Sequence, residues 1–356
     1  MTKNQLTAST PGRICLFGEH QDYLGLPVIA AAISRRISVT VQRGGLPQVC
    51  LHLPDLEQEI TFDISQFPLT YLHDRDYFSS AMNVLYREGL RFSEGISGHV
   101  SGNIPINAGT SSSSALLISW LSVLSQLADE PRTFTPAQLA EFAYVAEVLE
   151  FGDPGGMMDH YSTALGGVIY LESVPAIHVE PFQPRLSTFV LGDSGEPKDT
   201  IGLLKHVKYG MLAAMDKMRA FDDTFSLETL PIDQLNRYVH LLTADEETLV
   251  RGNLSDRDIL REALQLLRQP TIDHRQFGKL LTRHQTNLRE AKRISTPKID
   301  RMIDAALAAG AYGAKINGSG GGGCMFAYAP DNAQYVAEAI ERAGGRAYLI
   351  DVDKGI

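Results

Sequence analysis

The sequence predicts an α+β protein with two domains, and three observations support this class. The chain has 356 residues, of which 44% are hydrophobic and 21% charged, and this length exceeds what one compact core usually holds. Short apolar or alternating runs dominate the first 100 residues, whereas helical periodicity dominates the second half. The chain then ends with strands and a helix in alternation, which is typical of α+β domains.

The first half is expected to combine strands with a few long helices. Four runs broken by Gly, Pro and Asp are predicted strands, namely residues 12–17, 28–43, 48–53 and 96–104, and residues 75–88 are a predicted helix. The run 115–127 is apolar on nearly every face, which is typical of a buried helix. A further helix is expected from Thr135 to about Glu150, because Thr135, Pro136 and Gln138 form an N-terminal capping pattern.

A domain boundary is predicted after a strand near residues 167–172. The proline-spaced segment 175–184 is the expected linker, and it divides the chain into domains of residues 1–180 and 181–356. The second domain is expected to open with a strand at 188–192. Its predicted helices are residues 202–221, 235–249, 256–268, 274–292 and 297–309, followed by strands 314–316 and 325–328, a helix at 332–343 and a strand at 347–352.

Composition excludes several classes of function. The net charge is −10, which argues against a nucleic-acid-binding surface, because such a surface needs many basic residues. The three cysteines are far apart and form no CxxC pair, so neither a disulfide framework nor a zinc site is expected. No export signal is expected, because the first dozen residues carry no apolar run. No membrane span is expected, because no later run approaches about 18 apolar residues. A cytoplasmic protein is the expectation.

The first of three chemical clusters lies at residues 11–25. An apolar strand reaches Gly18 and is followed at once by Glu19, His20 and Asp22. Carboxylates and an imidazole at a strand end can bind several hydroxyls of one small polyol, and such polar recognition discriminates strongly. A solvated polar turn fits the pattern about as well.

The second cluster is a loop of small residues, 105–115, that leads into the apolar helix. A helix N-terminus offers free N–H groups to a phosphate, and serine hydroxyls can donate to phosphate or bind Mg²⁺. The alternative is a simple helix cap. Four consecutive serines, from Ser111 to Ser114, exceed what a cap needs, so an anion-binding site is favoured.

The third cluster is the glycine-rich loop of residues 315–324. Gly318, Gly320 and Gly323 match the dinucleotide-binding spacing, but no crossover helix and no acidic residue about 20 positions on accompany them. A backbone wall close to a ligand and a flexible connection between strands remain as alternatives. The sequence contains no P-loop, no GxSxG motif and no set of protein-kinase motifs.

In this order, the three clusters resemble the motifs of the GHMP small-molecule kinases, the family named for galactokinase, homoserine kinase, mevalonate kinase and phosphomevalonate kinase. The resemblance spans nearly the whole chain. The first motif, PGRICLFGEHQDYLG, resembles the galactokinase branch. It implies the two-domain GHMP fold, with an N-terminal domain like domain 2 of ribosomal protein S5 and a ferredoxin-like α/β C-terminal domain.

The resemblance also implies roles for particular residues. Glu19, His20 and Asp22 would hold sugar hydroxyls, and Arg13 would lie beside the reacting hydroxyl. Residues 146–160 resemble the stretch that ends in the catalytic aspartate, which implies catalysis by Asp159 with Arg13. The same stretch implies Mg²⁺ binding by Glu147 with Ser113. From the residues alone, Glu147 fits a solvated helix position and Asp159 fits a helix cap.

The implied reaction is transfer of the γ-phosphoryl group of ATP to a hydroxyl. ATP phosphates would lie over the two loops, at Asn107, Ala108, Gly109, Thr110, Ser111, Ser112, Ser113 and Ser114, and at Gly318, Ser319 and Gly320. A cation beside Asp159 should keep this carboxylate ionised, so Asp159 could act as a base or as an orienting group.

Two departures from the galactokinase pattern bear on the acceptor. Galactokinases usually carry Asn-Ser-x-Val-x-His where residues 191–200 read LGDSGEPKDT, and residues 162–167 resemble mevalonate kinases equally well. The expected acceptor is the anomeric hydroxyl of a galactose-like sugar. A mevalonate-kinase-type enzyme and a non-catalytic sensor of sugar and ATP are the alternatives. A monomer or homodimer with no nucleic-acid or membrane partner is expected.

Overall fold

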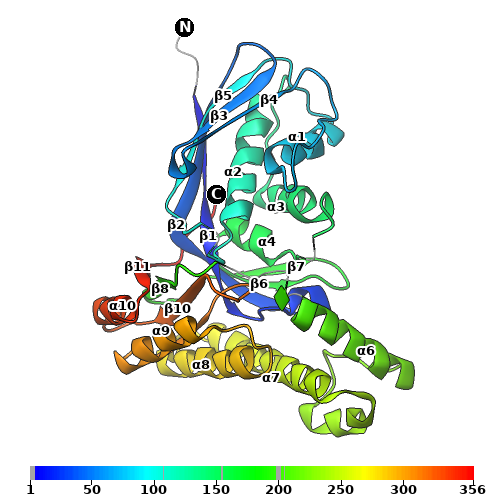
Figure 1. Cartoon of the computed structure of the whole chain (residues 1–356), viewed down its shortest axis with the longest axis vertical. Helices are drawn as coiled ribbons and strands as arrows, with labels where there is room; N and C mark the ends of the chain where they lie inside the picture. Colours follow the sequence, from blue (N-terminus) through cyan, green and yellow to red (C-terminus); the bar gives the residue numbers. More distant parts are fainter. Residues whose placement is uncertain (1–4, 107, 154, 198–201, 204) are drawn as a thin grey trace.

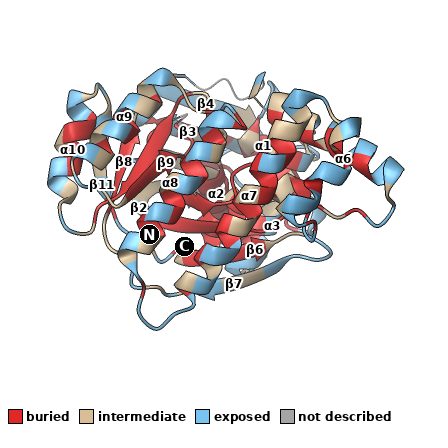
Figure 2. Ribbon diagram, turned by 90° about the horizontal axis from the view of Figure 1, so that it is seen from below, coloured by how far each residue is buried: buried red, intermediate tan, exposed pale blue. Residues whose placement is uncertain are grey.

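The computed structural model describes residues 5–106, 108–153, 155–197, 202–203 and 205–356. Two β-sheets, each covered by helices, lie at opposite ends of the molecule (Figure 1). The predicted α+β class is confirmed. Figure 2 shows that the buried residues concentrate on the sheets and on the helix faces turned toward them.

The larger sheet is built around one long strand. Strand β2 (Val28–Arg43) pairs antiparallel with β1 (Leu6–Phe17), β5 (Ile96–Gly102) and β6 (Val168–Glu172). The sheet order is β4-β3-β5-β2-β6-β7, with β1 on β2. The remaining strands are β3 (Gln48–Leu53), β4 (Gln58–Asp63) and β7 (His178–Phe182).

Four helices cover one face of this sheet (Figure 1). They are α1 (Tyr77–Arg87), α2 (Ser112–Leu127), α3 (Pro136–Tyr144) and α4 (Met158–Leu165). Helix α2 carries the fully buried Trp120 and packs on β1 and β2. The predicted capping box of α3 is confirmed, since Thr135 Oγ1 accepts from the backbone of Gln138 and the Gln138 side chain accepts from the backbone of Thr135.

The smaller sheet is antiparallel, in the order β11-β8-β10-β9. Its strands are β8 (Phe189–Asp193), β9 (Gly313–Ile316), β10 (Cys324–Tyr328) and β11 (Arg346–Ile350). The helices of this half are α6 (Gly210–Phe221), α7 (Ala244–Leu267), α8 (His274–Glu290), α9 (Pro297–Ala308) and α10 (Ala333–Arg342). Side chains from β1, including Phe17, share one hydrophobic cluster with Phe277 and Phe326, so β1 joins the two halves.

Two expectations about the elements are wrong, and one strand was missed. The segment 175–184 is not simply a linker, because its residues His178–Phe182 form β7, which pairs antiparallel with β6. The predicted helix 235–249 begins only at Ala244, since Thr243 and Glu246 form the capping box there, and it continues without a break through 256–268. Strand β4 was not predicted. The division into residues 1–180 and 181–356 stays a prediction, and β7 lies across it.

No helix of the described part of the chain is both long and apolar enough to cross a membrane.

Candidate active site

One cavity of about 640 Å³ at the junction of the two halves brings the three sequence clusters together. The predicted site residues that line it come from β1 and the turn after it, from both loops, and from the segment that ends in α4. They are Arg13, Glu19, His20, Asp22, Gly109, Ser111, Ser112, Ser113, Ser114, Glu147, Asp159, Gly318 and Ser319. Ala108 and Thr110 are buried behind this wall, Gly320 packs against Ile294, and Asn107 lies outside the described residues.

Arg13 and Asp159 form an ion pair at the centre of the cavity. Nε and Nη2 of Arg13 donate to Asp159 Oδ1 over 2.9 and 2.7 Å, and Nη1 donates to the carbonyl of Gly109. Burial alone would raise the pKa of Asp159, but the adjacent guanidinium lowers it below its ordinary value. The ion pair therefore favours the ionised form of Asp159.

The serine loop presents an uncapped helix N-terminus to the cavity. Ser111, the residue before α2, has the left-handed backbone angle φ 58°, and no side chain caps the helix. The serines thus do not serve as a cap here. The first turn of a 16-residue helix retains free N–H groups, which together with the helix dipole attract anions.

The glycine-rich loop packs backbone to backbone on the serine loop. A Cβ atom at Gly318 would lie 2.8 Å from the carbonyl oxygen of Gly109, and one at Gly323 would lie 2.7 Å from that of Ala108. Asn317 Nδ2 donates to the Gly109 carbonyl over 2.8 Å. The glycines are therefore needed for close approach between the two loops, which fix each other's position.

Glu147 lies on a π-helical turn, Val145–Leu149, that continues α3. Its Oε2 accepts from Ser114 Oγ over 2.7 Å and lies 2.8 Å from His160 Nε2. Burial would raise the pKa of Glu147, but the contacts with His160, Ser113 and Ser114 lower it overall. An ionised carboxylate is thus placed beside the first turn of α2. Single π-turns often occur at functional sites.

His20 and Asp22 line the cavity from the turn that follows β1. His20 Nδ1 is 2.8 Å from Tyr23 Oη, and Nε2 is 3.0 Å from the Ser319 carbonyl. Burial, and then the nearby Lys292, lower the pKa of His20 to about 3, so the ring is neutral. Burial, and then the charge of Asp159, raise the pKa of Asp22.

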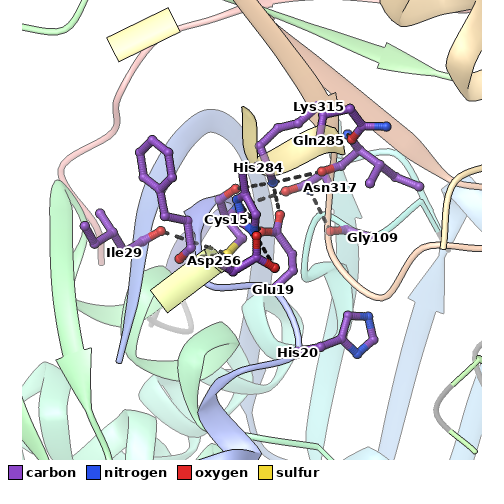
Figure 3. A network of polar contacts seen from close by, with 12 residues as sticks. Cys15, Glu19, His20, Ile29, Gly109, Asp256, His284, Gln285, Lys315 and Asn317 are labelled. Atoms are coloured by element: carbon purple, nitrogen blue, oxygen red, sulfur yellow. Dashed lines mark hydrogen bonds and ion pairs between the residues drawn. The ribbon is translucent and has the colours of Figure 1, made fainter. Parts of the chain in front are cut away.

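The side chain of Glu19 forms its ion pair with a buried lysine. Its Oε1 pairs with Lys315, whose Nζ also donates to the carbonyls of Cys15 and Ile316 over 3.0 and 2.9 Å. Figure 3 shows this buried network of polar side chains, with His284 between Glu19 and Asp256 and with His20 apart from it. Lys292 completes it through Asp256, at 2.8 Å.

Sequence reasoning missed these partners and one further group. Asp256 lies on α7, His284 on α8 and Lys315 on β9. Polar residues on the buried faces of the two helices, and the position of Lys315 at the start of the glycine-rich cluster, were the available signals. Arg75 and Asp153 also line the cavity; Asp153 lies within the 146–160 motif but was given no role, and Arg75 belongs to no motif.

Comparison with known proteins agrees with this arrangement. The galactokinase galactose-binding signature matches residues 2–43, the N-terminal domain of GHMP kinases residues 76–167, and the C-terminal domain of GHMP kinases residues 260–346. A mevalonate kinase of Pyrococcus furiosus is 26% identical over 98% of this chain and 97% of its own length. A galactokinase of the same organism is 28% identical over 95% and 93%.

Solved structures show the same fold. A crystal structure of Lactococcus lactis galactokinase complexed with galactose superposes with a TM-score of 0.87 at 22% identity, covering 99% of this chain and 95% of that one. The Methanococcus jannaschii mevalonate kinase gives a TM-score of 0.78 at 19% identity, with 99% and 100% coverage. The family matches and the fold define an ATP-dependent small-molecule kinase, which phosphorylates an alcohol group. The chain belongs to the GHMP kinase family.

Proposed function

We propose that the protein transfers the γ-phosphoryl group of ATP to the anomeric hydroxyl of a galactose-like sugar. The observation that carries this proposal is that the Arg13–Asp159 pair, the N-terminus of α2 and Asp22 open into one cavity. The galactokinase signature over residues 2–43 supports a sugar as the acceptor. Neutral His20 and the carboxylate of Asp22 supply hydrogen-bonding groups suited to hydroxyls.

In this proposal, Asp159 receives or orients the hydroxyl proton of the acceptor. Arg13 keeps Asp159 ionised and holds its carboxylate in one orientation through two hydrogen bonds to the same oxygen. The pairing also weakens Asp159 as a base, so positioning carries much of its effect. This suits phosphoryl transfer, in which catalysis consists mainly of positioning and charge stabilisation.

Glu147 and the neighbouring serine hydroxyls fit a Mg²⁺ ion that arrives with ATP. Mg²⁺ prefers oxygen ligands and is commonly bound through one or two carboxylates together with substrate phosphates. Glu147 is ionised and lies beside Ser113 and Ser114 at the start of α2. When bound, the ion would neutralise charge on the phosphates. The phosphates themselves would accept from the free N–H groups of α2.

A mevalonate-type acceptor is the second candidate. Relatives named mevalonate kinase match 98% of the chain, and residues 162–167 resemble that branch. Mevalonate carries a carboxylate and therefore needs a cation. The two arginines among the described lining residues, Arg13 and Arg75, are already paired with Asp159 and Asp153, which favours a neutral sugar over an anionic acceptor.

The test is ADP release from the purified protein with Mg·ATP, against free hexoses and mevalonate. We expect turnover on a galactose-like hexose, with ³¹P NMR of the product showing phosphate on the anomeric oxygen. Turnover on mevalonate alone would reject the sugar proposal, and nucleotide binding without turnover on any acceptor would favour the non-catalytic sensor.

A further inference from the structure

The cavity holds far more negative than positive charge. Its described lining residues include five acidic side chains but only two from arginine or lysine; the acids are Glu19, Asp22, Glu147, Asp153 and Asp159, and the cations are Arg13 and Arg75. A nucleotide triphosphate adds several more negative charges. Besides the Mg²⁺ ion that would arrive with ATP, an arginine or lysine able to reach the phosphates would offset part of this charge.

Arg13 cannot fill this role. Its side chain is 4% exposed, and all three guanidinium nitrogens already donate, to Asp159 and to the carbonyl of Gly109. Turning Arg13 toward a phosphate would leave Asp159 without the cation that keeps it ionised. Among the described residues that line the cavity, only Arg75 then remains as an arginine or lysine.

Arg75 is available. Its side chain is 53% exposed, and its Nε pairs with Asp153 Oδ2 over 3.0 Å. Exposed ion pairs of this kind contribute little to stability, so a more strongly charged partner can replace the aspartate. A guanidinium also matches the geometry of phosphate oxygens and can bind two of them at once.

Arg75 also lies on the side of the cavity where phosphates are expected. It precedes the N-cap of α1 by one residue, in the left-handed backbone conformation at φ 58°. Strained backbone of this kind is often retained at functional sites. Although burial lowers the pKa of Arg75, the charges of Tyr77, Asp153 and Glu147 raise it overall. Glu147 in turn contacts the first turn of α2 through Ser114.

We propose that Arg75 binds a phosphate group of the nucleotide, and that it exchanges its ion pair with Asp153 for this contact when the nucleotide enters. Asp153 holds the guanidinium at the cavity wall in the ligand-free protein and competes with phosphate for it. The inference rests on the proposed function, since it assumes a nucleotide triphosphate as ligand.

The test compares three variants by calorimetric titration with Mg²⁺ and AMPPNP, a non-hydrolysable ATP analogue. Arg75→Ala should raise the Kd by about tenfold to a hundredfold, the effect of losing a charge-assisted hydrogen bond. Asp153→Asn should leave the Kd unchanged or lower it, because it removes a competitor. Arg87→Ala is the matched control. This variant removes a half-exposed arginine of α1 that pairs with Glu150. Like Asp153, Glu150 follows the π-helical turn Val145–Leu149, but neither Arg87 nor Glu150 lines the cavity.

The opposite directions of the first two variants separate the proposal from a structural role. If the ion pair only stabilised the local fold, Arg75→Ala and Asp153→Asn would weaken binding alike, and that result would overturn the proposal. An unchanged Kd in Arg75→Ala would overturn it as well. If the wild-type protein itself binds no AMPPNP, the proposed function fails, and the inference falls with it.

Discussion

Replacing Lys315 by methionine should destabilise the protein by about 3–5 kcal/mol, the cost of leaving a buried charge without its partner. The Lys315 side chain is fully buried, and Glu19, its ion-pair partner, is 1% exposed. Methionine is unbranched and one heavy atom shorter than lysine, so it fills most of the same space but leaves the carboxylate unpaired. Lys292 does not compensate, because it donates to the backbone carbonyl of Glu19.

The loss should depend on pH, because His284 lies 3.7 Å from Glu19 Oε2. Burial, and then the charges of Lys315 and Lys292, hold the pKa of His284 well below its ordinary value. As pH falls, the unfolded chain therefore protonates this histidine before the native protein does, and the native protein loses stability. Without Lys315, the pKa of His284 rises toward its unfolded value, and protonation then also compensates Glu19. The difference in stability between wild type and variant should therefore shrink as pH falls from 8 toward 5.

Urea unfolding of four proteins measures these effects: wild type, Lys315→Met, Glu19→Gln and the double variant. Glu19→Gln should cost less than Lys315→Met, because Lys315 keeps two carbonyl acceptors. The double variant should recover most of the loss of Lys315→Met, since it carries no unpaired carboxylate. A loss below about 1 kcal/mol for Lys315→Met, or double-variant losses that simply add, would refute the reasoning.

Two other perturbations address the acceptor side of the cavity. Gly156→Ala would place a Cβ 1.7 Å from Asp22 Oδ2 and should therefore displace this flexible side chain. We expect kcat/KM for the acceptor to fall at least tenfold, with little change in Tm. Unchanged kinetics would argue against a role for Asp22. Asp22→Asn should raise Tm at pH 7. The pKa of Asp22 is raised in the folded protein, so ionising this carboxyl costs more in the folded state than in the unfolded chain. The wild type therefore loses stability as pH rises through the folded-state pKa, and the asparagine variant does not. This gain should shrink as pH falls toward the ordinary pKa of an aspartate, about 4, because the ionised form that burial disfavours becomes less populated. A lower Tm at pH 7 would contradict the assignment.

Much of the fold follows from local sequence signals. The long strand β2 and the capping box of α3 are where the sequence predicts them, because alternation and capping act between near neighbours. The prolines of residues 175–184 misled the prediction. Pro181 lies in β7, the last strand of its sheet, and an edge strand tolerates proline because it has one side without ladder hydrogen bonds.

Site residues that belong to sequence motifs could be predicted. Their ion-pair partners from distant parts of the chain could not. The motif around Glu19 indicated a polar turn, but its pairing with Lys315 joins residues 296 positions apart. The ion pair of Arg75 with Asp153 likewise depends on how α1 meets the turn after α3. Such pairings are set by tertiary packing, which periodicity and capping patterns do not encode.

The central claim is that Asp159 is the catalytic carboxylate of a kinase site, and one comparison tests it most directly. ADP release and AMPPNP affinity are measured for the wild type and for Asp159→Asn, which keeps the size of the side chain and removes its charge. The account predicts that the variant loses turnover by at least a hundredfold, the scale of acid–base and charge contributions at such sites, while the Kd for AMPPNP stays within about threefold of wild type. Turnover close to the wild-type rate in the variant would contradict it.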